Sequence, residues 1–417
     1  MIISKSEKAN KKLNNPESKA NPVYKLTSLG WIPEEWEVKM LKDICVKFLN
    51  GGTPSTKIVD FWNGKIPWIT GADIIEQKLI VRKFITENAV KKSSTNIVTK
   101  GNILMVTRTG VGKLIIAPFD VAISQDLTGL FLNNKLIEVK FAYYFFTGNK
   151  GLLRKLNQGT SINGITRVVL ESIKLALPTI PEQTTIANLL STWDKAILTL
   201  SSLITQKELR KKWLMQQLLT GKKRLKGFLE NWKEMKLDEV AKIVMGQSPS
   251  SVAYNENGFG LPLIQGNADI ENRKTIIRYW TKEITKICEA GDIIMSVRAP
   301  VGTIGIATSK SCIGRGVCSF KSYNNTSQIF LYYFFENYEN KWRSFEQGST
   351  FSSVNSNDIK NLSLKIPVNL KERTTISNIL QSADKEIQLL KSKLEKLKKQ
   401  KKGLMQVLLT GKVRVKI

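Results

Sequence analysis

The chain has 417 residues, with 64 Lys and Arg against 35 Asp and Glu, so its formal net charge at pH 7 is +29. Single hydrophobic cores rarely exceed roughly 250–300 residues, so this length favours two or three domains. A hydrophobic content of 42% excludes a disordered basic tail, and the absence of histidine excludes His-based triads, HExxH zinc proteases and Cys₂His₂ fingers.

The positive charge indicates a polyanionic partner, most often nucleic acid, and the alternative is a solvated lysine-rich surface. The cysteines form no CxxC pair; they are Cys45, Cys288, Cys312 and Cys318. The first residues lack the apolar stretch of a signal peptide, and no apolar run is long enough for a membrane span. We therefore expect a cytoplasmic protein with no membrane partner.

An internal repeat dominates the sequence. Six segments recur in the same order about 190 residues apart: 66–74 with 261–270, 100–117 with 290–307, 141–146 with 330–335, 156–161 with 345–350, 183–197 with 373–387, and 214–224 with 404–414. The predicted organisation is a variable tail at 1–21, a globular domain at 22–180, a helix at 181–221, a second globular domain at 222–370 and a second helix at 371–417.

Each globular domain has short apolar runs separated by Gly, Pro, Asn and Ser. The runs at 102–106 and 292–297 predict buried strands, and the YYFF segments predict short helices that pack on a core. The predicted class is α+β, and the sequence leaves the strand topology open.

Two long helices are predicted from Glu182 to Thr220 and from Glu372 to Thr410, followed by Gly221 and Gly411 as helix stops. Their apolar residues alternate at steps of four and three, which is typical of a coiled coil. Three lysines interrupt these seams, namely Lys207, Lys211 and Lys401. Such lysines either fix register and orientation or lie where the helix drifts from the seam.

The simplest partner for each apolar stripe is the other helix. A parallel pair would require a long return connection, so we expect an antiparallel pair with a pseudo-twofold axis that relates two similar globular domains. Two similar but non-identical basic domains predict an asymmetric DNA site with two half-sites.

The residues at 30–74, which begin GWIPEEWEVKMLKDICVKFLNGGTPSTK, resemble the start of a target-recognition domain in specificity subunits of type I restriction–modification systems, the S or HsdS family. The segments IPEQTTIANLLSTWDKAI (180–197) and LMQQLLTGKKR (214–224) resemble its central region, and their second copies resemble its C-terminal region. The segment NLKERTTI (369–376) departs by lacking the proline of IPEQTTI, and the first 20 or so residues lie outside the resemblance.

The resemblance implies a non-catalytic subunit that binds double-stranded DNA and docks two adenine-N6 methyltransferase subunits on its helices. Two further restriction subunits would complete the complex. S-adenosylmethionine, ATP and Mg²⁺ are then expected on the partner subunits, with no cofactor or metal bound directly by this chain.

Motifs for such chemistry are absent from the sequence. It contains no Asn/Asp-Pro-Pro-aromatic motif and no GxxxxGK[ST] phosphate loop. The segment TGVGK (109–113) has its glycines too close together for that loop, and its second copy reads APVGT, so a turn after a buried strand is predicted.

Candidate DNA contacts follow buried strands or lie in paired polar loops. An arginine after a strand can reach a phosphate or form two hydrogen bonds with guanine, or it can hold the turn. Loop hydroxyls and amides can contact phosphates and base edges, or they can cap helices. The predicted contacts are Thr53, Ser55, Lys57, Thr70, Arg108, Lys113, Gln158, Ser161, Asn163, Gln247, Ser248, Ser250, Gln265, Arg298, Arg315, Gln347, Ser349 and Thr350.

Five aromatic residues could stack on bases, but their spacing is more typical of core packing. They are Trp68, Tyr143, Tyr144, Tyr332 and Tyr333. Two other functions stay open from the residues alone: a stand-alone DNA-modifying enzyme, and a coiled-coil scaffold whose domains bind protein or anionic membrane. The recognised bases cannot be predicted.

The predicted helices allow a test of whether the distance between the half-sites and the bases recognised in them are set by different parts of the chain. Inserting or deleting one heptad in both helices should change the distance between the half-sites and leave their sequences unchanged, because a heptad adds length without touching the globular domains. Sequencing of DNA selected by each variant measures both quantities. A changed base preference would contradict this separation.

Overall fold

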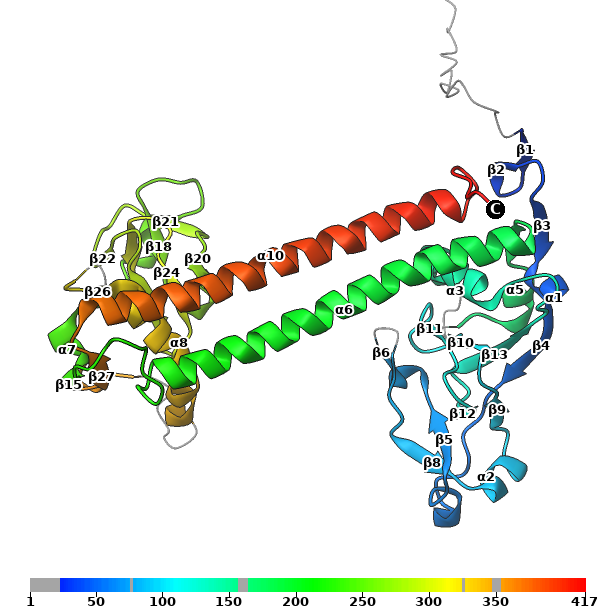
Figure 1. Ribbon diagram of the computed structural model, residues 1–417, viewed down its shortest axis with the longest axis horizontal. Helices are drawn as coiled ribbons and strands as arrows, with labels where there is room; N and C mark the ends of the chain where they lie inside the picture. Colours follow the sequence, from blue (N-terminus) through cyan, green and yellow to red (C-terminus); the bar gives the residue numbers. More distant parts are fainter. Residues whose placement is uncertain (1–22, 76–77, 157–163, 325–326, 347–353) are drawn as a thin grey trace, which may run out of the picture. The chain divides into compact units, whose positions relative to one another are not determined.

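The computed structural model describes residues 23–75, 78–156, 164–324, 327–346 and 354–417 of the protein. The chain divides into two compact units, unit 1 with Met1–Leu198 and Glu395–Ile417, and unit 2 with Thr199–Leu394. Each combines small sheets, short helices and parts of two long helices, α6 and α10, so the predicted α+β class is confirmed (Figure 1). The tail at 1–21 lies outside the described residues.

Unit 1 contains two larger sheets among its described residues. One has the order β11 (Leu114–Ile116), β10 (Ile103–Val106), β13 (Leu127–Leu132) and β4 (Cys45–Asn50). The other has the order β8 (Lys83–Ile85), β5 (Ile66–Ile69), β12 (Val121–Ile123) and β9 (Asn96–Val98). Smaller pairs join β1 (Tyr24–Thr27) to β2 (Gly30–Pro33), β3 (Glu37–Met40) to β14 (Lys174–Leu177), and β6 (Ile74–Ile75) to β7 (Lys78–Leu79).

The short helices of unit 1 are α1 (Leu41–Ile44), α2 (Glu87–Lys91), α3 (Val139–Gly148), α4 (Lys150–Lys155) and α5 (Arg167–Glu171), with 3₁₀ turns η1 (Val59–Phe61) and η2 (Gly71–Asp73). Helix α3 carries the YYFF segment and is buried along most of its length, as predicted. Phe141 and Phe146 of α3 lie in one core with Ile186 and Leu190 of α6 and Leu408 of α10.

Unit 2 repeats this plan. One sheet has the order β16 (Ala241–Met245), β26 (Val317–Ser322), β23 (Ile293–Ser296), β24 (Ile304–Ile306), β20 (Lys274–Thr275) and β19 (Ile270–Glu271). The other has the order β17 (Tyr254–Asn255), β21 (Tyr279–Thr281), β18 (Leu261–Ile264), β25 (Ser311–Ile313) and β22 (Ile287–Cys288). The remaining elements are β15 (Trp232–Lys236) paired with β27 (Ser363–Pro367), the helices α7 (Leu237–Val240), α8 (Gln328–Glu346) and α9 (Ser356–Lys360), and the turns η3 (Ser251–Ala253) and η4 (Asn267–Asp269).

Strand order confirms the internal repeat. Strands β11, β10, β13 and β4 correspond to β24, β23, β26 and β16, and strands β8, β5, β12 and β9 correspond to β21, β18, β25 and β22. The one parallel pair of each second sheet, β5 with β12 and β18 with β25, recurs with it. Parallel strands end at the same edge, so this pairing brings the loops after β5 and β12, and after β18 and β25, close together.

Helices α6 (Ile180–Leu218) and α10 (Leu370–Leu408) each contain 39 residues. Both begin two residues before the predicted start and end two residues before the predicted end. The backbone N–H groups in the first turn of a helix have no partner within the helix. Proline has no backbone N–H, so Pro181 loses no hydrogen bond at this position. Helix α10 has no such proline, and Asn369 Oδ1 instead accepts a hydrogen bond from Lys371 N at 2.9 Å. Gly221 and Gly411 both have φ of +70°, as expected for helix stops.

The boundary between the two compact units falls inside α6 and again inside α10. The two ends of each helix belong to different units, because each end packs against the core of its own unit. Residue limits for the separate domains stay a prediction.

Each unit shows locally that α6 and α10 run antiparallel. In unit 1, Lys401 Nζ lies 2.5 Å from Asp194 Oδ1, and in unit 2, Lys211 Nζ lies 2.7 Å from Asp384 Oδ1. Lys207 forms an ion pair with Glu386. The lysines that interrupt the seams therefore pair across the helices, which favours the orientation-fixing interpretation over drift.

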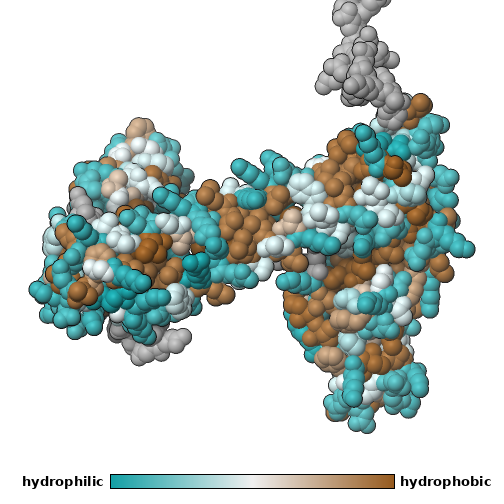
Figure 2. Space-filling view, viewed as in Figure 1, coloured by the Kyte–Doolittle hydropathy of each residue, from teal (hydrophilic) through white to brown (hydrophobic). Residues whose placement is uncertain are grey.

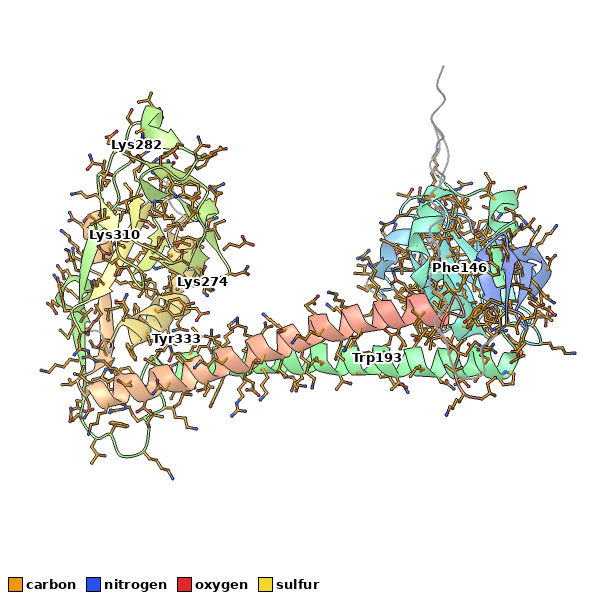
Figure 3. The ribbon with its side chains drawn as sticks, turned by 90° about the horizontal axis from the view of Figure 1, so that it is seen from above. Phe146, Trp193, Lys274, Lys282, Lys310 and Tyr333 are labelled. Atoms are coloured by element: carbon orange, nitrogen blue, oxygen red, sulfur yellow. The ribbon has the colours of Figure 1, made fainter. Side chains whose placement is uncertain are left out.

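The tyrosines of the YYFF segments join these pairs. The hydroxyl of Tyr144 donates to Asp194 Oδ2 at 2.8 Å, and that of Tyr333 donates to Asp384 Oδ2 at 2.7 Å. Figure 3 shows Tyr333 beside the helix pair. Burial, followed by the hydrogen-bonded aspartate, raises the pKa of both tyrosines, so each hydroxyl stays protonated.

The four cysteines are free thiols. Burial raises the pKa of Cys45 and of Cys288 to about 11, so neither thiol ionises near neutral pH. In the described part of the chain, no helix combines the length and apolar character that a membrane crossing requires.

Replacing Asp194 tests the buried pair. The Lys401 side chain is only 9% exposed, so Asp194→Ala leaves a nearly buried ammonium without its carboxylate and removes the acceptor of Tyr144. We expect a loss of about 2 kcal/mol, which lowers the thermal unfolding midpoint by about 4–8 °C.

Glu208→Ala is the matched control, because Glu208 and its partner Lys391 are 47% and 57% exposed. That pair should contribute less than about 1 kcal/mol. Equal small shifts in both variants would contradict a structural role for Asp194.

Candidate nucleic-acid interface

Strand β10 of unit 1 ends at an exposed basic turn. Arg108 follows the buried strand and is exposed, as predicted. Gly110 and Gly112 have φ of +92° and +94°, a conformation that other residues rarely adopt, and the hydrogen bond from Val106 N to Lys113 O closes the turn at 2.9 Å. Lys113 Nζ lies 3.3 Å from the carbonyl oxygen of Gly71, so the turn is attached to the loop after β5.

Two adjoining hollows, of about 750 Å³ and about 400 Å³, share Arg108 and Gln125 in their walls. We call them together the basic groove. Its charged side chains are Arg108, Lys113, Lys150, Arg154 and Arg167, with the acidic Asp126. This excess of positive charge on a concave surface suits a phosphate backbone.

Lys150 and Arg154 lie one helical turn apart on α4 and face the groove. Partial burial and the positive charges of Arg154 and Lys401 lower the pKa of Lys150, so its proton is held less firmly than usual. An anion in the groove would relieve this repulsion. Arg167 is partly neutralised by Glu171, whose Oε1 lies 2.7 Å from Arg167 Nε.

The polar loop at 51–57 lies against the turn after β12. Gly52 N donates to Ile123 O at 2.9 Å, and Thr53 Oγ1 forms a hydrogen bond with Gln125 Oε1. Ser55 and Lys57 are exposed. The structure therefore brings Thr53 to the groove beside Gln125, and it places Ser55 and Lys57 on the surface of the same loop.

Thr70 has a local structural task. Its hydroxyl accepts from Ala72 N at 3.3 Å and donates to Asp73 Oδ2 at 2.9 Å, which caps the turn η2. At the corresponding place in unit 2, Gln265 N donates to Asp269 Oδ2 at 2.7 Å, and the Gln265 side chain is half-buried. DNA contact by these two residues stays a prediction, and capping already engages the hydroxyl of Thr70.

Unit 2 has a corresponding edge. Arg298 is exposed after β23, and Arg315 is exposed after β25. Ser248 Oγ accepts a hydrogen bond from Arg315 N at 3.1 Å, and Ser250 N donates to Glu283 Oε2 at 3.0 Å. Gln247 is exposed, and its backbone N donates to Ile313 O at 2.9 Å.

The third pair of loops lies outside the described residues. This applies to Gln158, Ser161, Asn163, Gln347, Ser349 and Thr350. The residues that follow them are described: Ile165 N donates to Thr107 O at 2.7 Å, and Val354 N donates to Val297 O at 3.0 Å. Ile165 and Val354 are therefore each bonded to the residue before the arginine that follows the central strand.

Sequence reasoning missed four residues of the basic groove. Lys150 and Arg154 carried a usable signal, since two basic residues four apart share one helix face. Gln125 carried a signal too, since the repeat aligns it with the predicted contact Arg315, whereas Arg167 carried none, because only the folded contacts bring it to Arg108. The candidate stacking aromatics pack in the cores instead, as the spacing favoured, and Trp68 and Tyr144 are each 4% exposed.

Lysines also cover the surface of unit 2, where Lys274, Lys282 and Lys310 are exposed (Figure 3). Hydrophilic and hydrophobic residues are interspersed on the visible face of both units (Figure 2). A hollow of about 620 Å³ in unit 2 has as many acidic as basic side chains in its wall, so the groove of unit 1 is distinguished by its excess of positive charge.

A family model described as "Type I restriction modification DNA specificity domain" matches residues 33–209 and 229–399. The chain is 30% identical to the "Putative type I restriction enzyme MjaX specificity subunit" of Methanocaldococcus jannaschii, over 94% of this chain and 97% of the relative. It is 25% identical to the MjaVIII specificity subunit of the same organism, over 92% of this chain and 94% of the relative.

A solved chain supports the same fold. It comes from a study titled as the structural basis of complex assembly and conformational transition of the type I R-M system. Its TM-score is 0.65 at 21% identity, covering 92% of this chain and 99% of that chain.

The groove predicts a salt-dependent loss of DNA affinity on removal of its cations. Arg154→Ala and Lys150→Ala should each weaken binding of all duplexes similarly and reduce the slope of log affinity against log salt by about one, since each removes a phosphate contact. Fluorescence anisotropy at several salt concentrations measures this slope.

Lys135→Ala is the control, because Lys135 is exposed and outside the groove lining. An equal loss in the control would show a diffuse charge effect, and an unchanged slope in the groove variants would remove the groove from the DNA interface.

Proposed function

Because the chain belongs to the type I restriction–modification DNA specificity family, we propose that it is the subunit that selects the DNA site for a type I restriction–modification complex. Each unit reads one half of an asymmetric, bipartite site on double-stranded DNA. The two half-sites differ because the two units present different side chains on the same backbone framework.

One observation carries this proposal: the edge that bears the candidate contacts occurs twice. Arg108 and Arg298 follow corresponding strands, β10 and β23. The loops at 51–57 and 246–251 lie against corresponding turns through the same type of hydrogen bond, from Gly52 N to Ile123 O and from Gln247 N to Ile313 O, each at 2.9 Å. A repeated framework with divergent side chains is what reading two different half-sites requires.

The helices are the proposed docking surface for two methyltransferase subunits, with restriction subunits added in the complete complex. Apolar side chains remain exposed on α6 and α10; they include Leu198 (60%), Leu209 (63%), Trp213 (47%) and Leu389 (71%). Exposed apolar side chains on a helix favour burial against a partner. The relatives are named as specificity subunits of restriction enzymes, which agrees with such partners.

We assign no catalytic step to this chain. The absence of histidine and the raised pKa values of the Cys288 and Cys318 thiols leave few groups for proton transfer or nucleophilic attack near neutral pH. Methyl transfer from S-adenosylmethionine, and ATP- and Mg²⁺-dependent cleavage, would belong to the partner subunits.

Footprinting with the methyltransferase partners present tests the proposal. We expect two separated protected segments of different sequence, and affinity that falls steeply with salt. A competition assay between the selected duplex and a random duplex of equal length gives the specificity ratio.

Contiguous, sequence-independent protection would contradict the proposal and favour a scaffold whose basic surface binds DNA without reading it. The purified chain alone serves as the control for catalysis, and methylation of DNA by the chain alone would establish an enzyme.

A further inference from the structure

The same tight turn follows the strands β12 and β25. In unit 1, Leu127 N donates to Ser124 O at 3.1 Å, and in unit 2, Val317 N donates to Gly314 O at 3.1 Å. The central residues are therefore 125 and 126 in one turn and 315 and 316 in the other. Gln125 and Arg315 occupy the same first central position, about 190 residues apart.

Neighbouring backbone holds both turns in the same way. Thr107 N donates to Asp126 O at 2.9 Å, and Val297 N donates to Gly316 O at 2.9 Å. These bonds join each turn to the residue before Arg108 or Arg298. The position of the turn relative to the arginine is therefore defined by main-chain atoms alone.

Close packing leaves these turns little freedom. A Cβ on Gly51 would lie 2.2 Å from Ser124 O, and a Cβ on Gly246 would lie 2.1 Å from Gly314 O. A Cβ on Gly316 would lie 2.2 Å from Gln265 O. Backbone approaches of this kind exclude larger residues, and they fix the turn before any ligand binds.

In each unit, a hydroxyl group of the paired polar loop forms a hydrogen bond with the first central residue of the turn. Thr53 Oγ1 forms a hydrogen bond with Gln125 Oε1, and Ser248 Oγ accepts from Arg315 N at 3.1 Å. Thr53 and Ser248 stand at the same place in their paired loops. Gln125 and Arg315 are both exposed, and Gln125 lines both hollows of the basic groove beside Arg108.

The side chains at this shared position differ in what they can recognise. A glutamine amide forms a bidentate pair with N6 and N7 of adenine, and an arginine forks onto O6 and N7 of guanine. Thr53 can orient the Gln125 amide and still leave its NH₂ group and one lone pair of Oε1 for a base.

We propose that residues 125 and 315 are equivalent base-reading positions, at which Gln125 reads an adenine in one half-site and Arg315 reads a guanine in the other. The proposal rests on the DNA-selecting function and adds to it the residues and the base types.

Selection from randomised duplexes tests the assignment, with the full-length chain in complex with its methyltransferase partners. The wild type should select two half-sites. Gln125→Arg should change one base pair of one half-site from A·T to G·C, with about a tenfold loss of affinity for the wild-type duplex and an unchanged second half-site. Arg315→Gln should produce the reverse change in the second half-site only.

Asn134→Arg is the control, because it adds the same charge at an exposed position of unit 1 that lies outside the groove lining and outside the two long helices. It should leave both half-sites unchanged. Gln125→Ala adds neither charge nor bulk at an exposed position, and it should abolish the preference for adenine at that base pair while the thermal unfolding midpoint stays that of the wild type.

Gln125→Arg and Gln125→Ala variants that select the wild-type half-sites would overturn the assignment, as would Gln125→Arg binding all duplexes more tightly without a new preference. The proposed function would still stand in those cases. A wild-type complex that selects no pair of half-sites would overturn the proposed function, and the assignment with it.

Discussion

The arrangement of each unit depends on a partly buried ion pair between α6 and α10. Each helix carries an aspartate in its first half, Asp194 or Asp384, and a lysine in its second half, Lys211 or Lys401. In an antiparallel pair each aspartate meets a lysine. In a parallel pair of the same register the two aspartates would face each other, as would the two lysines, and like charges with little solvent are strongly unfavourable. The apolar seams attract the helices, but these charges select their direction.

The same carboxylates connect the helices to the globular parts of the units. Asp194 accepts from the Tyr144 hydroxyl through one oxygen and lies beside the Lys401 ammonium through the other, and the ammonium lies 5.1 Å from the centre of the Tyr144 ring. In unit 2, Tyr333, Asp384 and Lys211 form the equivalent set, which also includes Glu336 at 2.9 Å from Lys211. Helix direction and the seating of each globular part are thus determined by one polar cluster, whose burial makes every hydrogen bond in it costly to lose.

The sequence predicted those structural features that depend on residues close together in the chain. The heptad spacing predicted both helices, and a strand followed by a glycine turn predicted the exposed positions of Arg108 and Arg298. Gln125 was not predicted, although the repeat aligns it with the predicted contact Arg315, and only the folded structure shows that its side chain meets Thr53, which is 72 residues earlier in the chain. The strand order also arises from pairings between distant segments, such as β5 with β12. The antiparallel direction of the helices was predicted from the chain connection and is confirmed, and the alternation of aspartate and lysine in the sequence gives a second reason for it.

At the edge of each unit, main-chain atoms hold the turn in place, whereas side-chain atoms are available to contact a ligand. The glycines at 51 and 246 approach carbonyl oxygens so closely that a side chain there would displace the turn, and the turn itself is held by main-chain hydrogen bonds. The side chains at 125 and 315 point from this framework without being needed for it, since glutamine and arginine occupy the same turn geometry in the two units. A change of residue there alters the hydrogen-bonding groups offered to a ligand at little cost to the fold. A duplicated framework of this kind can therefore acquire a new base preference in one unit while the other unit keeps its own.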